Sequence, residues 1–244
     1  KTAIIIPSRL AASRLPNKPL ELIKNKEMIL HVYEAAVKSN SGDVYVASPD
    51  QKIIDVIKTH GGKAIKTIEN HETGTDRIYE VLQKELADET KIIVNLQGDM
   101  PNINPYDISK LVAYMSSNSC EIGTLASNIM SVSELTNRNI VKVAVEKKLS
   151  SDIFSKAVDF CRITKNNTSN LYHHIGIYAF TRDALVRYVK LKRSRLELER
   201  KLEQLRALEN NISIYVGYVE TSPLSVDTKE DLIEVKKVME TNGK

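Results

Sequence analysis

Three cations stand close together just after the first apolar run of the chain. Arg9, Arg14 and Lys18 fall within ten residues that contain no acidic residue and no glycine. Arginine offers a planar pair of donors and lysine a compact charge, and both are used to bind polyphosphates. Pro16 and Pro19 restrict the backbone around them, which lowers the entropy cost of holding the cations in place. The segment from Arg9 to Lys18 predicts a loop that binds phosphate through its side chains. The alternative is a solvated surface loop.

Two aspartates form a second group of candidate residues. Asp99 follows the apolar run 92–96, and Gly98 before it would let a ligand approach the backbone closely. A carboxylate opposite a polyphosphate repels it unless a cation lies between them, so Asp99 beside a basic loop suggests Mg²⁺. Asp227 precedes a predicted helix, where it could supply a second carboxylate ligand or could instead be the helix N-cap.

Polar residues in two further segments could contact a ligand. Residues 71–77 place a glycine just before a predicted helix, with Thr75 or Asp76 as its cap, and a helix N-terminus can also receive the polar edge of a ligand. His173 and His174 are adjacent in a predicted strand, so their rings should point to opposite faces. No Cys, Asp or Glu stands at zinc-ligand spacing from them, which favours a polar substrate over a metal as partner for one ring.

The elements that must position these residues alternate between strand and helix in the first half of the chain. Short apolar runs bounded by turn residues predict buried parallel strands, at 3–6, 44–47, 64–66 and 92–96. Helical patterns lie between them, at 28–36, 53–57 and 76–86. This alternation predicts right-handed crossovers and a parallel sheet with helices on both faces. Ligands of such sheets bind beyond the carboxyl ends of the strands, where the candidate segments lie.

The second half of the chain is predicted to be more mixed. Strands are expected at 141–145, 172–180 and 214–219, and an amphipathic helix at 229–239. Leucines that recur at helical spacing from Leu191 to Leu208 predict one helix there, with a solvated charged face.

Composition narrows the class of protein. A length of 244 residues favours one α/β domain with insertions. A net charge of +4, an aromatic content of 5% and the absence of Trp argue against nucleic-acid binding. No apolar run approaches the roughly 20 residues that a membrane-spanning helix needs, so we expect a cytoplasmic protein without membrane insertion. Two cysteines, Cys120 and Cys161, are too few for a disulfide framework.

Six short motifs occur in order along nearly the whole chain. They lie at residues 7–9 with 14–20, 73–77, 94–99, 174–178, 202–206 and 226–228. Together they resemble those of the 3-deoxy-manno-octulosonate cytidylyltransferases, also called CMP-KDO synthetases. The first motif alone would fit sugar nucleotidyltransferases broadly, whereas 174–178 and 202–206 are much more specific.

The resemblance implies a fold, an activity, a cofactor and an assembly. The fold would be a Rossmann-like nucleotidyltransferase fold, with a mostly parallel central sheet, helices on both faces and a mixed insertion. The activity would be Mg²⁺-dependent transfer of CMP from CTP to 3-deoxy-D-manno-octulosonate (KDO), giving CMP-KDO and pyrophosphate and activating KDO for lipopolysaccharide biosynthesis. The family's enzymes are typically homodimers. Within one domain, 1–244, we expect a nucleotide-binding half at 1–118, a sugar-acid-binding and dimerisation region at 119–215, and a return to the core at 216–244.

The resemblance also assigns roles to residues at matching positions. Those that would bind the nucleotide and metal are Arg9, Arg14 and Lys18 at the triphosphate, Thr73, Gly74 and Gln97 at the cytidine, and Asp99 and Asp227 at Mg²⁺. Among these, the catalytic residues would be Arg14, Lys18, Asp99 and Asp227, which neutralise charge on the phosphates. Those that would contact the sugar acid are His174, Tyr178, Glu203, Gln204 and Lys156.

Several positions depart from the family pattern. Met100 stands where the family has Glu, Ala12 where it has Ser, Lys156 where it has Arg, and Ser225 where it has Gly. Residues 159–161 replace an Ile-Pro-aromatic run. Two alternatives to KDO activation stay open: a cytidylyltransferase for another sugar acid such as sialic acid, and a catalytically weak nucleotide-binding paralogue.

Overall fold

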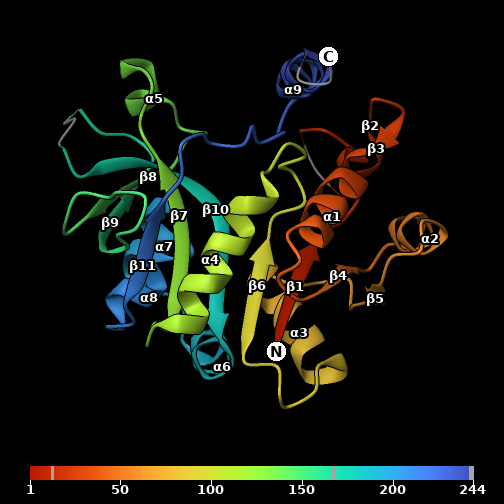
Figure 1. Cartoon of the computed structure of the whole chain (residues 1–244), viewed down its shortest axis with the longest axis horizontal. Helices are drawn as coiled ribbons and strands as arrows, with labels where there is room; N and C mark the ends of the chain where they lie inside the picture. Colours follow the sequence, from red (N-terminus) through yellow and green to blue (C-terminus); the bar gives the residue numbers. More distant parts are fainter. Residues whose placement is uncertain (12–13, 166–168, 242–244) are drawn as a thin grey trace. The chain divides into compact units, whose positions relative to one another are not determined.

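The computed structural model describes residues 1–11, 14–165 and 169–241. Ala12, one of the departures from the family pattern, lies outside these ranges, as do residues 166–168. The chain divides into two units, one of residues 1–110 with 223–244 and the other of residues 111–222 (Figure 1). Within the described ranges, no helix is both long enough and apolar enough to cross a membrane.

The first unit contains a parallel sheet with the strand order β5-β4-β1-β6. The strands are β1 (Thr2–Pro7), β4 (Asp43–Ser48), β5 (Ala64–Lys66) and β6 (Ile92–Leu96). The helices α1 (Met28–Lys38), α2 (Gln51–Thr59) and α3 (Gly74–Glu85) connect them and pack against them. Every residue of β6 is buried, as expected for a strand covered on both faces. The parallel sheet predicted from the apolar runs is confirmed.

The two central strands bring two loops to one edge of this sheet. Ile5 of β1 lies opposite Asn95 of β6, so the two strands end side by side. The basic loop that starts after Pro7 and the acidic segment that starts after Leu96 therefore leave the sheet next to each other.

A hydrophobic cluster joins the basic loop to the C-terminal segment. Leu15 of the loop and Val226 beside Asp227 are both buried in it. The remaining buried members come from the β2–β3 hairpin (Leu22–Ile23 and Lys26–Glu27), α1 and α9 (Lys229–Thr241), and are Ile23, Met28, Leu232 and Val235. Because apolar residues flank the charged ones, the short helical turn at Lys18–Leu20 and the segment before α9 are fixed relative to each other.

The second unit is a mixed sheet, as predicted for this half. Its strands are β7 (Ile122–Ser127), β8 (Lys142–Val145), β9 (Ser155–Cys161), β10 (Leu171–Thr181) and β11 (Ile214–Tyr218). The pairing of β11 with β7 is parallel, whereas the others are antiparallel. The accompanying helices are α5 (Val132–Thr136) and α6 (Arg182–Lys190), and α4 (Pro105–Ser117) contains the boundary between the units. The sequence prediction contained no counterpart of β7, β9, α4, α5 or α6.

The single helix predicted from Leu191 to Leu208 is wrong. The structure has two short helices instead, α7 (Arg195–Arg200) and α8 (Leu205–Glu209). Lys201 ends α7 in the left-handed region, at φ 54°. The turn brings Glu197 of α7 within 2.8 Å of Arg206 of α8. In a continuous helix, nine residues would separate these side chains by about 13 Å, so the ion pair requires the break.

Candidate active site

The residues predicted to bind phosphates and metal line one pocket of the first unit. The pocket has a volume of about 300 Å³. Its polar and charged lining includes Arg9, Arg14, Lys18, Gln97, Asp99 and Asp227. Arg14 and Lys18 both line this pocket, but their side chains are 55% and 17% exposed, respectively. Phosphate binding by the loop stays a prediction.

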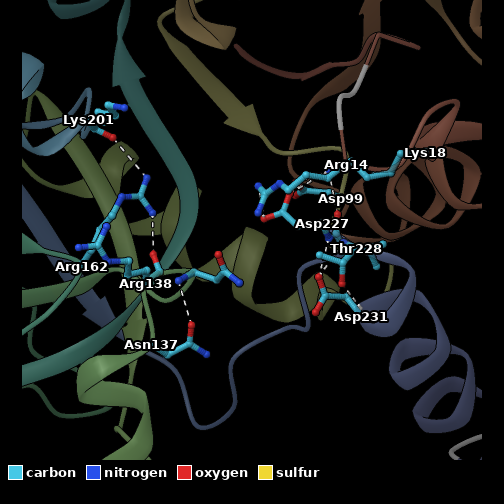
Figure 2. A network of polar contacts seen from close by, with 12 residues as sticks. Arg14, Lys18, Asp99, Asn137, Arg138, Arg162, Lys201, Asp227, Thr228 and Asp231 are labelled. Atoms are coloured by element: carbon cyan, nitrogen blue, oxygen red, sulfur yellow. Dashed lines mark hydrogen bonds and ion pairs between the residues drawn. The ribbon is translucent and has the colours of Figure 1, made fainter.

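Lys18 is the centre of the polar contacts in this pocket. Its Nζ donates to Asp99 Oδ2 at 3.1 Å, to the carbonyl of Val226 at 2.8 Å and to Asp227 Oδ1 at 3.4 Å. Arg14 Nη2 lies 3.3 Å from Asp227 Oδ2, so this carboxylate sits between two cations (Figure 2). The Lys18 side chain is 17% exposed, which leaves its charge partly desolvated.

The cap of α9 explains how Asp227 comes to face the pocket. The backbone N–H of Asp231 donates to Thr228 Oγ1, at 3.2 Å. In return, Asp231 Oδ2 accepts from the backbone N–H groups of Thr228 and Asp227, at 2.8 and 2.9 Å. Thr228 and Asp231 therefore cap the helix, and the N-cap alternative for Asp227 is wrong. The capping leaves the Asp227 carboxylate to contact Arg14 and Lys18.

A backbone bond ties the two acidic segments together. The N–H of Val226 donates to the carbonyl of Asp99, at 2.9 Å. Gly98 is closely packed, because a Cβ on it would lie 3.1 Å from Ile29 Cδ1, and this side chain would have to shift by a few tenths of an ångström. Met100 is buried, at 3% exposure, and does not line the pocket. The family's acidic residue is thus replaced here by a side chain that belongs to the core.

Two carboxylates are the donors available for a metal ion. Over the described ranges, no group of three or more His, Cys, Asp or Glu side chains is arranged to hold a metal. Asp99 and Asp227 nevertheless converge, since both contact the same lysine ammonium. Mg²⁺ is usually held by one or two carboxylates together with substrate phosphates, so this donor set fits Mg²⁺ in the presence of a nucleotide.

A second pocket of the first unit adjoins the start of α3. It has a volume of about 210 Å³, and Arg9 and Gln97 line it as well as the first pocket. Thr73 and Gly74 also line it. Thr73 is the N-cap of α3, since its Oγ1 accepts from the N–H of Asp76 at 3.2 Å and its own N–H donates to Asp76 Oδ2 at 3.1 Å. The predicted caps, Thr75 and Asp76, are therefore wrong by two or three positions.

Sequence reasoning missed a buried charged network of which two members, His71 and Arg77, line this second pocket. Glu80 accepts from the N–H of Ile68 at 3.1 Å and contacts His71 Nε2 at 2.6 Å. Arg77 donates to Thr67 Oγ1 and to the carbonyl of Ile68. Burial, and then the charge of Arg9, lowers the pKa of Arg77. Arg77 belongs to the motif at residues 73–77, but only the tertiary contacts show that it binds residues 67–69.

The sugar-acid candidates lie in the second unit, and three of them are close together. The rings of His174 and Tyr178 are 5.3 Å apart between centroids. Burial, and then the charge of Glu203, raises the pKa of Tyr178. Burial lowers the pKa of His174 to about 3, so this ring is neutral at physiological pH. His173 points the other way, with Nδ1 2.9 Å from Glu134 Oε2, which confirms that the two rings face opposite sides.

The other two sugar-acid candidates are placed differently. Gln204 is half-buried in the turn between α7 and α8, next to Glu203. Lys156 lies in β9, with its Nζ 5.8 Å from the ring centroid of Tyr215. Glu203 lines a separate cavity of about 400 Å³ along α7.

A buried ion pair holds the turn that carries Glu203 and Gln204. Arg206 Nε and Nη2 donate to the two carboxylate oxygens of Glu197, at 2.8 and 2.6 Å. The Glu197 and Arg206 side chains are 1% and 5% exposed. The guanidinium of Arg206 lies over the ring of Tyr188, with its Cζ 4.9 Å from the ring centroid. The Tyr188 hydroxyl donates to the carbonyl of Glu203 at 2.7 Å. The leucine pattern gave no sign of this pair.

The parallel sheet and the basic pocket indicate a nucleotidyltransferase, and comparisons with known proteins agree with this class. The family model described as Cytidylyltransferase matches residues 3–214. The chain is 45% identical to the 3-deoxy-manno-octulosonate cytidylyltransferase of Brucella anthropi, over 95% of this chain and 94% of that protein. It is 44% identical to the enzyme of Brucella ovis, over 95% and 93%.

A solved structure extends this likeness to the whole fold. It is that of a CMP:2-keto-3-deoxy-manno-octonic acid synthetase complexed with CTP. The two match with a TM-score of 0.89 and 37% sequence identity, over 99% of this chain and 100% of the other. The chain belongs to the 3-deoxy-manno-octulosonate cytidylyltransferase family. The resemblance inferred from the six motifs and the predicted nucleotidyltransferase fold are both confirmed.

Proposed function

We propose that the protein transfers CMP from CTP to KDO and releases pyrophosphate, which activates KDO for lipopolysaccharide biosynthesis. The observation that carries this proposal is the contact of Lys18 and Arg14 with Asp99 and Asp227 in one pocket beyond the ends of β1 and β6. Opposed cations and carboxylates are what a metal–triphosphate complex requires. The names of the relatives support KDO as the acceptor and CTP as the donor.

The two pockets of the first unit support a division of the nucleotide between them. Arg9, Arg14 and Lys18 would hold the triphosphate in the larger pocket, where they supply fixed positive charge. The adjoining pocket at the start of α3 would receive the cytidine. Thr73, Gly74 and Gln97 are the residues that would contact it. Gln97 and Arg9 line both pockets, so a single extended ligand can occupy them together.

Asp99 and Asp227 would hold Mg²⁺. When bound, the ion supplies charge neutralisation and polarisation at the α-phosphate. Lys18 and Arg14 now contact these carboxylates and would contact phosphate oxygens when CTP is present. Their charge would then stabilise the pyrophosphate as it leaves. The role of this chain is to orient the α-phosphate for in-line attack by the anomeric hydroxyl of KDO and to balance charge.

Residues of the second unit would bind the sugar acid. Burial keeps His174 neutral and raises the pKa of Tyr178 above its ordinary value, so both neutral side chains can form hydrogen bonds with sugar hydroxyls. Glu203 and Gln204 would complete this site from the turn that Tyr188 and Arg206 hold. Lys156 would meet the carboxylate in place of the family's arginine.

The second unit also supports a homodimer. Large apolar side chains are exposed on α5, β9 and the segments beside them, at Met130, Val132, Val158 and Ile163. We assign these side chains to a contact with a second copy, since contiguous exposed apolar surface marks interaction sites. Because the donor is CTP, we place the reaction in the cytoplasm.

Release of pyrophosphate from three substrate pairs tests this function. With Mg²⁺, we expect release from CTP with KDO, and none from CTP with sialic acid or from ATP with KDO. Release with sialic acid but not KDO would establish the other sugar-acid activity. CTP binding without release for any sugar acid would identify a nucleotide-binding paralogue instead.

A further inference from the structure

Thr124 occupies a fully buried position at an irregularity of β10. It lies in β7 opposite Tyr178, and the register between the two strands shifts between Ile175 and Tyr178. β-bulges are frequent beside functional sites, where they redirect side chains. Here Thr124 Oγ1 lies 2.6 Å from the carbonyl oxygen of Ile177 and 3.3 Å from that of Ile175.

These distances assign the hydroxyl proton of Thr124. Two oxygen atoms 2.6 Å apart need a proton between them, and a carbonyl cannot supply one. Thr124 therefore donates its single hydroxyl proton to Ile177. Its oxygen remains an acceptor, and His174 Nε2 lies 3.0 Å from it. The proton of this third contact must come from the imidazole.

This hydrogen bond determines which nitrogen of His174 carries the proton. The ring is neutral at physiological pH because burial lowers its pKa to about 3, so it has one N–H group. With that N–H at Nε2, the lone pair of Nδ1 is an acceptor. In the part of the chain that the structure describes, the bond to Thr124 is the only hydrogen bond of this ring. Phe160, edge-on at 5.2 Å between ring centroids, fixes the plane of the imidazole.

We propose that Thr124 is a positioning residue that holds His174 as its Nε2–H tautomer, so that Nδ1 accepts a hydrogen bond from a hydroxyl of the sugar acid. The ligand hydroxyl must then be the donor, which selects for a sugar group at that position and against an ether or carboxylate. This inference rests on the proposed function only for the identity of the sugar acid. The tautomer itself is a property of the protein without substrate.

NMR of protein labelled with ¹⁵N-histidine tests the tautomer directly. We expect long-range ¹H–¹⁵N correlations at pH 7.5 to show His174 protonated at Nε2, with its signals assigned by their loss in His174→Gln. Addition of KDO with a non-hydrolysable CTP analogue should shift the Nδ1 resonance of the wild-type protein. Protonation at Nδ1 in the free protein, or saturation with KDO without a shift of Nδ1, would overturn the proposal.

Variants of Thr124 separate positioning from a general packing role. Thr124→Ser keeps the hydroxyl and should retain the Nε2–H tautomer, whereas the nearly isosteric Thr124→Val should lose it. Loss of a neutral hydrogen bond predicts a rise of about 5-fold in KM for KDO in Thr124→Val, with KM for CTP unchanged. Ser127→Ala is the matched control, because it removes another buried hydroxyl of β7, which donates to the carbonyl of Asn128 at 3.4 Å.

The outcomes also distinguish this proposal from the proposed function. Absence of KDO-dependent turnover in the wild type, with the Nε2–H tautomer present, would reject the function and leave only the tautomer that Thr124 sets in place. Normal turnover in the wild type, with an unchanged tautomer and KM for KDO in Thr124→Val, would reject the role of Thr124. Equal rises in KM for KDO and CTP in Thr124→Val would show a packing defect and would also reject it.

Discussion

The ammonium of Lys18 lies 3.1 Å from a carboxylate oxygen of Asp99, although 81 residues separate them in the chain. The two side chains are 17% and 24% exposed, so the pair is shielded from water more than a surface ion pair. Leu15, buried beside the loop, anchors the backbone that carries the lysine. A glycine-rich loop binds phosphate through backbone N–H groups, whereas this loop presents charged side chains that a hydrophobic cluster holds in place.

Replacement of Lys18 tests whether this ammonium contributes to phosphate transfer. We expect Lys18→Met to lower kcat/KM for CTP by about 100- to 1000-fold, because a charge on the leaving group loses its partner. The measurement is the rate of pyrophosphate release at saturating KDO. Lys26→Met is the control, since Lys26 also forms an ion pair, with Glu34 at 2.7 Å, outside the pocket. Equal effects of the two substitutions would contradict the role of Lys18.

Replacement of Asp99 tests the metal site. Asp99→Asn should abolish turnover at low Mg²⁺ and raise the Mg²⁺ concentration for half-maximal activity about 10-fold or more, because Mg²⁺ prefers charged oxygen ligands. The circular dichroism spectrum should stay that of the wild type. Asp43→Asn, which breaks an exposed pair with Lys63, is the control. Near-normal activity of Asp99→Asn would remove Asp99 from the metal site.

The buried pair between Glu197 and Arg206 should be the most sensitive ion pair of the second unit. Arg206→Met leaves the Glu197 carboxylate buried without its main partner, which should lower the free energy of unfolding by about 3–5 kcal/mol. Urea unfolding measures this loss. The pair Arg195–Glu199 is exposed, so Arg195→Met should cost less than about 0.5 kcal/mol. A similar cost for both variants would show that burial of the pair is unimportant.

The pKa of His174 predicts a pH dependence of stability. The folded protein holds this pKa at about 3, against 6.5 for the ordinary side chain, so between these values the unfolded chain binds the proton that the folded protein excludes. Unfolding therefore becomes easier as pH falls through this window, and the group contributes no slope above it. Between pH 7 and pH 5 the wild type should lose about 2 kcal/mol more than His174→Gln does.

The measurement is urea unfolding of both proteins at several pH values. His173 and the other histidines are present in both, so their contributions cancel in the difference. Parallel stability curves for the two proteins between pH 5 and pH 7 would show that His174 is not buried in its neutral form.

Sequence patterns predicted what depends on local periodicity. The parallel strands of the first unit were found because runs such as Ile92–Leu96 are buried on both faces and bounded by turn residues. The candidate pocket followed from the rule that ligands bind beyond the carboxyl ends of such strands. Charge type then sufficed to suggest that Lys18 and Asp99 face the same ligand.

The errors arose where particular side-chain contacts, which hydrophobic periodicity does not report, decide the structure. The leucines from Leu191 to Leu208 fit one helix, but pairing of Glu197 with Arg206 favours a turn at Lys201. Asp227 is of a residue type that is common at helix N-caps, but the neighbouring Thr228 is the N-cap of α9. Thr124 carried no motif at all, since its importance depends on the register of β7 against β10.

The most direct test of CMP transfer from CTP to KDO is ³¹P NMR of the reaction mixture. With CTP, KDO and Mg²⁺, we expect the signals of CTP to be replaced by one phosphodiester signal, that of CMP-KDO, and by pyrophosphate in equal amount. The same spectrum without KDO should show CTP unchanged. Persistence of CTP in the presence of KDO, or pyrophosphate accompanied by free CMP with no phosphodiester, would contradict this transfer.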